Sequence, residues 1–328
     1  MTLLKYAAFA AGAAIALACG PACAQSGTVW KLPSAYPADN FHSENLSLFA
    51  QDVAAQSGGK LTITLHPGAS LFPAPSIKSA VRIGQVQAGE VLISLHDNED
   101  AIYGVDVIPF LATSYEGARK LWAASKPAVE QKFAEQGLMT LFAVPWPPQG
   151  IFAKKEISQI ADMKGLSFRT YNTTTQRLAE LIGAYAVNIQ AADLPSALAT
   201  GLINAFITSG ATGYDSKVWE TMGYFYDAQA WIPKNVTFVN RAAFDALDAD
   251  TRAAVLKAAA AAEARGWAMS QDKTKWYLDQ LIAKGMKVAA PSPALKSGLQ
   301  SVGDQLTAEW LVRAGGGGQT VIAGYKAK

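Results

Sequence analysis

The sequence predicts an α/β protein of two lobes, each with a mainly parallel sheet flanked by helices. Segments typical of strands and helices alternate from residue 28 to residue 94, and a second alternating set begins near residue 150. Such alternation favours parallel strands, because a crossover helix carries the chain back to the start of the next strand. The length agrees, since a chain of 328 residues usually forms two domains rather than one larger core.

The first set contains three short strands and two helices. Residues 28–32, 61–65 and 90–94 are predicted strands, and the middle one alternates apolar and polar side chains. A helix is expected over 41–56, because its apolar residues are spaced for one buried face and glycines follow it. Ser76 is expected to cap the second helix.

The second set repeats this organisation. It contains, in order, strands at 151–153 and 166–171, helices at 173–182 and 194–200, and a strand at 202–207. Asn172 and Asp193 are the expected N-caps of its two helices. The glycine-poor stretch 242–286 predicts helices long enough to run across both lobes. Ser292 starts the C-terminal helices, and Gly315 to Gly318 form a linker between two of them.

Residues 1–24 are typical of a secretory signal peptide. Lys5 precedes an apolar stretch over 6–18, which is too short to span a bilayer, and Ala22-Cys23-Ala24 suits a signal peptidase. Cleavage after Ala24 removes both cysteines, so the mature chain would contain no disulfide, thiolate nucleophile or Cys-ligated zinc. We therefore expect a periplasmic protein without a transmembrane helix.

Charge and motif content argue against nucleic-acid binding and against catalysis. The chain has 28 Lys+Arg against 26 Asp+Glu and no basic run, whereas a phosphate-binding surface needs clustered cations. The three histidines form no HExxH pair, and the sequence contains neither G-x-S-x-G nor G-x-G-x-x-G. The acidic stretch 96–100 could hold a hard cation, but a polar loop is the simpler interpretation. No cofactor and no metal are expected.

Two features are candidates for ligand binding. Arg169 lies in an apolar strand-like segment just before a helix N-terminus, where its guanidinium and the helix dipole would both favour a carboxylate. Pairing with an internal Asp or Glu is an equally good interpretation. Trp146 lies among three prolines between the two sets of strands and helices. It can be interpreted as an aromatic wall of a cleft between the lobes or, equally, as part of a structural crossover.

Five segments form a recognisable series, in order along the chain: 57–61 (SGGKL), 66–71 (HPGASL), 80–85 (AVRIGQ), 107–111 (VIPFL) and 160–169 (IADMKGLSFR). Their order and spacing resemble those of the DctP-type solute-binding proteins of tripartite ATP-independent periplasmic (TRAP) transporters. The most diagnostic is 160–169, which is similar to the family's "dlkGlkiR" segment. The resemblance covers essentially the whole mature chain.

The resemblance implies a two-lobed periplasmic binding protein of the type II-like class that closes over a small organic acid. It implies a first lobe of residues 25–148 plus about 235–274, and a second lobe of 149–234 plus about 275–328. The arginine at the position of Arg169 typically holds the substrate carboxylate in this family. The family's second arginine is not evident in 150–154, and its asparagine-bearing strand end is replaced by Thr208-Ser209.

These departures suggest a ligand with one principal carboxylate and a less polar remainder. The expected site residues beside Arg169 are Phe41, Trp146, Tyr171, Thr208, Ser209 and Trp231, with Asn40 and Asn98 as further candidates. The resemblance also implies docking on a permease of one small and one large membrane subunit. The alternatives are a binding protein of an ABC or tripartite tricarboxylate importer, or a secreted α/β enzyme, which would need a general base.

Overall fold

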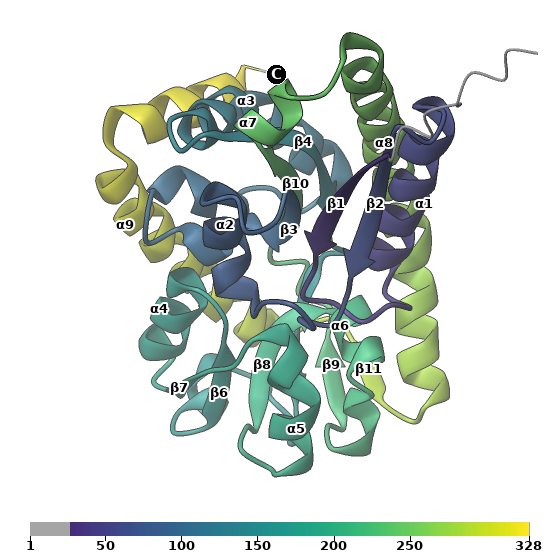
Figure 1. Cartoon of the computed structure of the whole chain (residues 1–328). Coiled ribbons are helices and arrows are strands. Elements are labelled where there is room, and N and C mark those ends of the chain that lie inside the picture. Colours follow the sequence, from purple (N-terminus) through teal and green to yellow (C-terminus); the bar gives the residue numbers. More distant parts are fainter. Residues whose placement is uncertain (1–26, 328) are drawn as a thin grey trace, which may run out of the picture.

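The computed structural model describes residues 27–327, which fold into two lobes (Figure 1). The predicted signal peptide lies outside the described residues. The first lobe contains the parallel pair β1–β2 and a three-stranded sheet in the order β3–β10–β4. Its elements are β1 (Thr28–Pro33), α1 (Phe41–Gln56), β2 (Leu61–His66), α2 (Ala74–Arg82), β3 (Ala88–Leu92), α3 (Tyr115–Ala134), β4 (Leu138–Pro145), β10 (Lys234–Asn240) and α7 (Arg241–Asp245).

The second lobe is built on a six-stranded sheet in the order β11–β9–β5–β8–β6–β7. Short helices α4 and α5 connect its parallel strands, and α6 follows β8 directly (Figure 1). Its elements are β5 (Gln149–Ala153), β6 (Ser167–Thr170), α4 (Thr173–Leu181), β7 (Tyr185–Asn188), α5 (Leu194–Ala199), β8 (Ala205–Ser209), α6 (Gly210–Asp215), β9 (Tyr224–Tyr226) and β11 (Lys287–Ala289).

The two-lobed α/β class is confirmed, but parallel pairing does not dominate. Parallel pairs join β1 to β2, β6 to both β7 and β8, and β9 to β11. Antiparallel pairs join β10 to β3 and β4, and β5 to β8 and β9. β5 and β10 are each the first strand after the chain crosses from the other lobe. Each therefore enters its sheet at the end that faces the other lobe, and it runs antiparallel to the strands on both sides of it.

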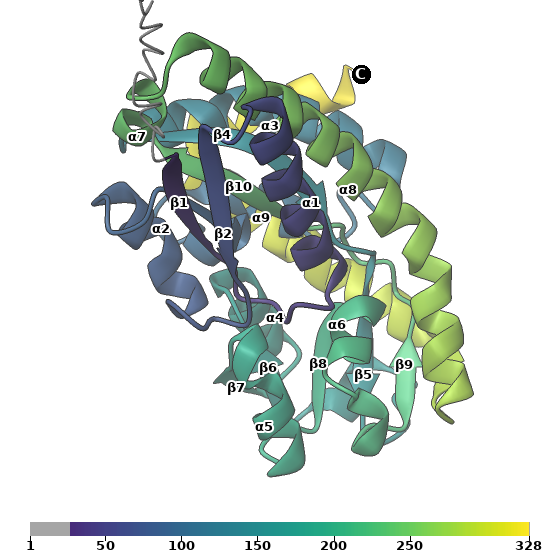
Figure 2. The same cartoon turned by 45° about the vertical axis from the view of Figure 1, so that its right-hand side comes forward.

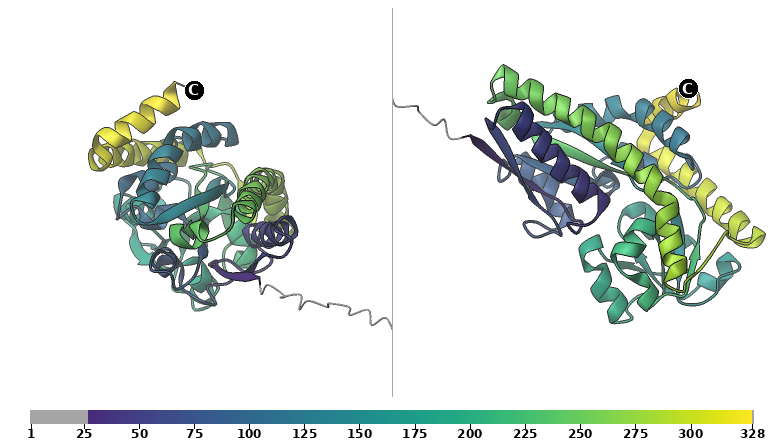
Figure 3. Two further views of the ribbon diagram at one scale, coloured as in Figure 1. Left: turned by 45° about the horizontal axis from the view of Figure 1, so that its top comes forward. Right: turned by 90° about the vertical axis from the view of Figure 1, so that its right-hand side faces the viewer.

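Two long helices connect the lobes, as predicted. Helix α8 (Ala249–Ala283) packs on α1 and β4 with one part of its length and on α6 and β11 with another (Figures 2 and 3). Helix α9 (Pro293–Lys326) contacts α3 in the first lobe and α4 in the second. Within α9 only Gly315 leaves helical geometry, at φ 55° and ψ −142°, so the expected four-glycine linker is a kink at one residue.

Some of the predicted N-cap residues cap their helices in the structure, and others do not. The Asn172 side chain accepts from the Thr175 N–H at the start of α4, and Ser292 caps α9 in the same way. Ser76 does not cap α2, because that helix begins one turn earlier, after Pro73, which fixes an extended backbone there. Asp193 precedes α5 but makes no side-chain cap bond.

No helix within residues 27–327 is long and apolar enough to cross a membrane. The chain passes between the lobes after β4, after β9 and along the two long helices. The expected boundaries at 148/149, 234/235 and about 274/275 remain a prediction. The carboxyl ends of β6 and β8 meet the first lobe, and ligands of open α/β sheets bind at such ends.

Candidate ligand-binding site

A cavity that is partly open to solvent lies between the lobes. Its walls come from the ends of β3, β6 and β8, from the segments that follow β1 and β7, and from the crossings near residues 146 and 233. The lining residues are Ala35, Tyr36, Ala74, Leu92, Leu95, Trp146, Gln149, Arg169, Tyr171, Gln190, Ala191, Thr208, Thr212 and Pro233. Most of these side chains are apolar or aromatic, as is usual for small-molecule sites.

Arg169 is the charged residue of this lining. It lies on β6 with 3% of its surface exposed, and its Nε donates to the Ile189 carbonyl oxygen at 2.8 Å. The arginines that form ion pairs within residues 27–327 are others, Arg177, Arg241 and Arg265. Within the described part of the chain Arg169 therefore pairs with no Asp or Glu, which rules out one of its two interpretations.

The environment of Arg169 is short of negative charge. Its guanidinium lies over the Tyr171 ring, 4.7 Å from the ring centre, and a cation–π contact of this kind replaces only part of the lost hydration. Burial accordingly lowers the pKa of Arg169 to about 10. A ligand carboxylate in the cavity would supply the missing countercharge through two parallel hydrogen bonds.

Trp146 and Tyr36 form an aromatic part of the cavity wall. The two rings meet edge to face, with centres 4.7 Å apart. The Trp146 Nε1 donates to the Asn235 Oδ1 at 2.8 Å, and the Tyr36 hydroxyl lies 3.4 Å from the same oxygen. Trp146 thus serves both expected purposes, because it belongs to the crossover and also lines the cavity.

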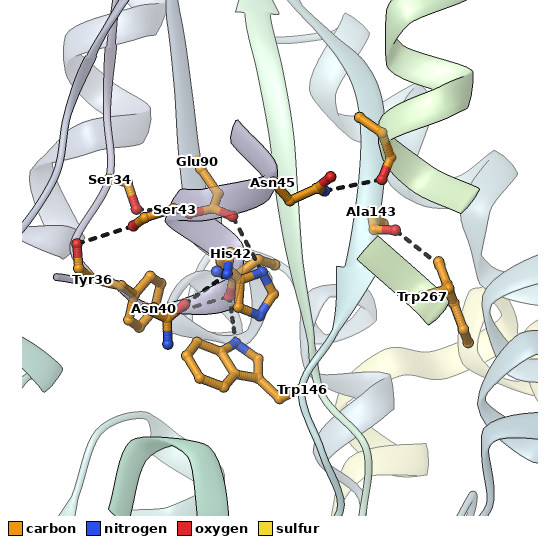
Figure 4. Close-up of polar contacts among 12 residues, drawn as sticks. Ser34, Tyr36, Asn40, His42, Ser43, Asn45, Glu90, Ala143, Trp146 and Trp267 are labelled. Carbon is orange, nitrogen blue, oxygen red and sulfur yellow. Dashed lines mark hydrogen bonds and ion pairs between the residues drawn. The ribbon is translucent and has the colours of Figure 1, made fainter. Parts of the chain in front are cut away.

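A buried polar cluster supports this wall from behind (Figure 4). The His42 ring packs on Trp146 with centres 4.3 Å apart, and its Nδ1 lies 3.4 Å from the Glu90 Oε1. The Ser34 hydroxyl donates to the other Glu90 oxygen at 2.8 Å. Burial lowers the pKa of His42, so a neutral imidazole packs against the indole at neutral pH.

Four predicted site residues line the cavity: Arg169, Trp146, Tyr171 and Thr208. The other five, Phe41, Asn40, Ser209, Trp231 and Asn98, are not among the lining residues. Phe41 and Trp231 are fully buried in the core, where they support the walls rather than face the cavity. The Ser209 hydroxyl accepts from the Thr212 N–H as the cap of α6. Asn98 lies on an exposed loop.

Asn40 connects the lobes instead of lining the cavity. It caps α1, and its Nδ2 donates to the Asp215 Oδ2 at 2.7 Å across the lobe junction. A second bond between the lobes joins the Asn172 Nδ2 to the Ser94 Oγ at 2.9 Å. We call the first contact the Asn40–Asp215 latch. These contacts show the two lobes closed on one another.

The latch predicts a pH dependence of ligand affinity. Burial raises the pKa of Asp215 to about 6, with Asp39 and Glu44 adding to the shift and the Asn40 amide and Lys273 opposing it. If the lobes part and Asp215 regains water, its pKa falls towards the ordinary 3.8, so the closed form binds a proton more readily. Affinity should therefore rise as pH falls from about 7.5 to 5, by at most about tenfold.

Titration calorimetry at pH 5, 6 and 7.5 measures this effect. Asp215→Asn should bind with little change over this range, because an amide keeps a partner for Asn40 without titrating. An equally steep pH dependence in Asp215→Asn would show that another group is responsible.

Sequence patterns missed Tyr36, Gln149, Gln190, Thr212 and Asn235. Gln149 offered the clearest signal, because it follows Pro147-Pro148 and begins a buried apolar strand. The side chains of the acidic stretch 96–100 already have partners within the protein: Glu99 binds Lys78 and His96, and the Asp97 carboxylate accepts from Thr174 of the second lobe. Within residues 27–327, no three His, Cys, Asp or Glu side chains converge as metal ligands would.

A cavity between two connected lobes, with a buried arginine that has no acidic partner, is typical of proteins that bind a small anion between two lobes. The model of the DctP family, "Bacterial extracellular solute-binding protein, family 7", matches residues 34–312. The chain belongs to this family. It is therefore an extracytoplasmic solute receptor of the TRAP type, and a transport binding protein rather than an enzyme.

Solved structures of similar proteins agree with this assignment. DctP6 of Bordetella pertussis, an extracytoplasmic solute receptor binding pyroglutamic acid, is 51% identical with a TM-score of 0.91, covering 92% of this chain and 100% of that one. A marine metagenome TRAP solute-binding protein, specific for pyroglutamate, is 45% identical at the same TM-score and coverages. A solute-binding protein of Albidiferax ferrireducens is 22% identical, and the alignment spans 65% of this chain and 64% of that protein.

Proposed function

We propose that this chain is the receptor of a TRAP transporter for pyroglutamate, a cyclic amide with a single carboxylate. The observation that carries the proposal is Arg169, a buried cation without an acidic partner in a cavity otherwise lined by neutral residues. The carboxylate of the ligand would pair with its guanidinium. The two structurally similar proteins described as binding pyroglutamate, at 51% and 45% identity, support this choice among carboxylates.

The remainder of the cavity suits a compact, weakly polar ring. Trp146 and Tyr171 offer aromatic faces, and Leu92, Leu95 and Pro233 offer aliphatic surface. A second carboxylate would find no second cation in this lining, which disfavours dicarboxylates. A sugar acid would bury several hydroxyls against apolar walls, which disfavours polyhydroxy acids.

Binding would act by stabilising the closed arrangement. A ligand that touches both lobes shifts the equilibrium towards closure by its difference in affinity for the two forms, and by no more than that difference. The closed receptor would then dock on the permease, made of one small and one large membrane subunit. An ABC or tripartite tricarboxylate importer would need a different permease, and the family assignment does not favour it.

The proposal predicts selective thermal stabilisation of the mature protein by L-pyroglutamate. The protein should first be unfolded in denaturant and refolded, because pyroglutamate is described as co-purified with the metagenome protein. At 100 times the dissociation constant, a ligand stabilises the fold by about 2.7 kcal/mol, which raises the melting temperature by several degrees.

Succinate and galactonate serve as comparison ligands and should produce a much smaller shift. Calorimetry on the same refolded sample would give the affinities. A larger shift with either comparison acid than with pyroglutamate would contradict the proposed ligand while leaving the receptor class intact.

A further inference from the structure

Gln149 is a buried residue of the cavity lining with a side chain that can form hydrogen bonds. The proposed pairing of Arg169 with the ligand carboxylate gives this side chain no role. It begins β5, it lines the cavity, and 3% of its surface is exposed. Its main chain is held on both sides, because its N–H donates to the Trp231 carbonyl at 3.0 Å and its carbonyl accepts from Ala230 at 2.9 Å. The residue therefore has little freedom to turn away from a ligand.

The side-chain amide of Gln149 has a defined orientation. Its Nε2 donates to the Pro147 carbonyl oxygen at 2.8 Å. A carbonyl can only accept, so the atom that faces it must be the NH₂ group and the other terminus must be the oxygen. Gln149 Oε1 accepts no hydrogen bond from the described residues. It is a pre-oriented acceptor in the wall of the cavity.

The charges around the cavity disfavour a ligand that would bring a second positive charge. Arg169 contributes one positive charge, and no carboxylate belongs to the lining. The buried acids nearby already have partners: Glu90 binds Ser34 and His42, Asp215 binds Asn40, Asp106 binds Lys234, and Asp97 accepts from Thr174. A ligand with a free ammonium group would therefore bury a second cation without a countercharge, which is costly.

We propose that Gln149 Oε1 accepts the ring N–H of the ligand, and that this neutral acceptor makes the site select a cyclic amide over the corresponding free amine. The inference rests on the proposed function and adds to it a residue that determines specificity. The lactam nitrogen of pyroglutamate is uncharged and carries one hydrogen. It can donate that hydrogen to Gln149 Oε1 without adding a second positive charge to that of Arg169. The secondary ammonium of proline, in a ring of the same size, would meet an amide oxygen where it needs a carboxylate.

The test compares two proteins with three ligands. Calorimetry measures the binding of each ligand to refolded wild type and to Gln149→Met. The ligands are L-pyroglutamate, L-proline and the lactone analogue of pyroglutamate, 5-oxotetrahydrofuran-2-carboxylate, which has oxygen in place of the ring N–H. Wild type should bind pyroglutamate about 10- to 100-fold more tightly than the lactone, because the lactone leaves a buried acceptor without a partner. Proline should not bind measurably.

In Gln149→Met the preference for pyroglutamate over the lactone should fall to within about threefold, since the partner of the N–H is gone. Gln131→Met is the matched control: it makes the same substitution on the exposed side of α3, where the side chain bonds to Glu135, and it should leave the wild-type ratio intact. A ratio unchanged in Gln149→Met, or tight binding of proline or the lactone by wild type, would overturn the role of Gln149. If wild type binds no pyroglutamate at all, the proposed function fails instead.

A measurement on wild type alone covers the case in which Gln149→Met does not fold. With ¹⁵N-labelled pyroglutamate, the ring N–H of the bound ligand should move downfield and exchange slowly with water. A rapidly exchanging N–H in the saturated complex would contradict a hydrogen bond to Gln149.

Discussion

Arg169→Ala is expected to lower the affinity for pyroglutamate and other small carboxylates by at least about 10²- to 10³-fold. Removing one partner of a buried, hydrogen-bonded ion pair costs about 3–5 kcal/mol, because the remaining charge stays buried without compensation. Arg169 is the cation of the cavity lining, so no neighbouring residue can take over its role. Isothermal titration calorimetry on refolded protein measures the loss directly.

Two controls separate a loss of binding from a loss of folding. Arg241→Ala removes an exposed arginine that pairs only with Asp245 on its own helix, and it should bind like wild type. Arg169→Met keeps much of the side-chain volume and removes the buried charge.

The unliganded Arg169→Met protein should be at least as stable as wild type. Burial lowers the pKa of Arg169 to about 10, which means that the folded state disfavours its charged form at neutral pH. Near-normal affinity in Arg169→Met or Arg169→Ala would exclude Arg169 from the site.

Gly150→Ala is expected to destabilise the fold by about 3 kcal/mol, at the upper end of overpacking effects in protein cores. A methyl group at this position would lie 2.3 Å from the Phe225 ring and 2.5 Å from the Tyr226 carbonyl oxygen. Both belong to β9, which pairs with β5 along this edge, so the strand must move as a whole. Urea unfolding with a common slope measures the change in the free energy of unfolding.

Gly223→Ala is the matched control, because a methyl group there has no neighbour closer than the Lys154 carbonyl oxygen at 3.7 Å. It should change the free energy of unfolding by less than about 1 kcal/mol. Equal effects of the two substitutions would show that the close approach of β9 does not set the cost. Because Gly150 follows Gln149, the Gly150→Ala protein should also bind ligand more weakly at temperatures where it is folded.

Local patterns predicted the elements well where one short segment contains all the determinants. β1, α1 and β2 lie within a residue or so of their predicted bounds, because their apolar spacing and the glycines that follow α1 act over a few residues. The cap of α4 is of the same kind, since Asn172 and Thr175 satisfy each other's main-chain donors. The start of α2 was missed because Pro73 sets it, one turn before the serine that could have capped it.

The direction of β5 and β10 could not be inferred in this way. Each strand looks like its neighbours in composition, yet each runs against them because the chain has just crossed from the other lobe. The same limit applied to the aromatic candidates. Phe41, Trp146, Tyr171 and Trp231 are all buried large rings, and only the packing of the lobes places Trp146 and Tyr171 on the cavity and the other two behind it.

The α/β class, the two lobes and the family followed from the residues and the resemblance alone, because these depend on short segments and their order. Arg169 was singled out in the same way, and its role in binding remains a prediction. The closure of the lobes and the neutral lining around Arg169 depend on contacts between distant segments. Asn40 meets Asp215 across 175 positions, and Trp146 meets Asn235 across 89. An arginine in a strand has the same local sequence whether it faces an acid or an empty cavity. Its lack of an acidic partner, on which the proposed binding role rests, is a property of the folded chain.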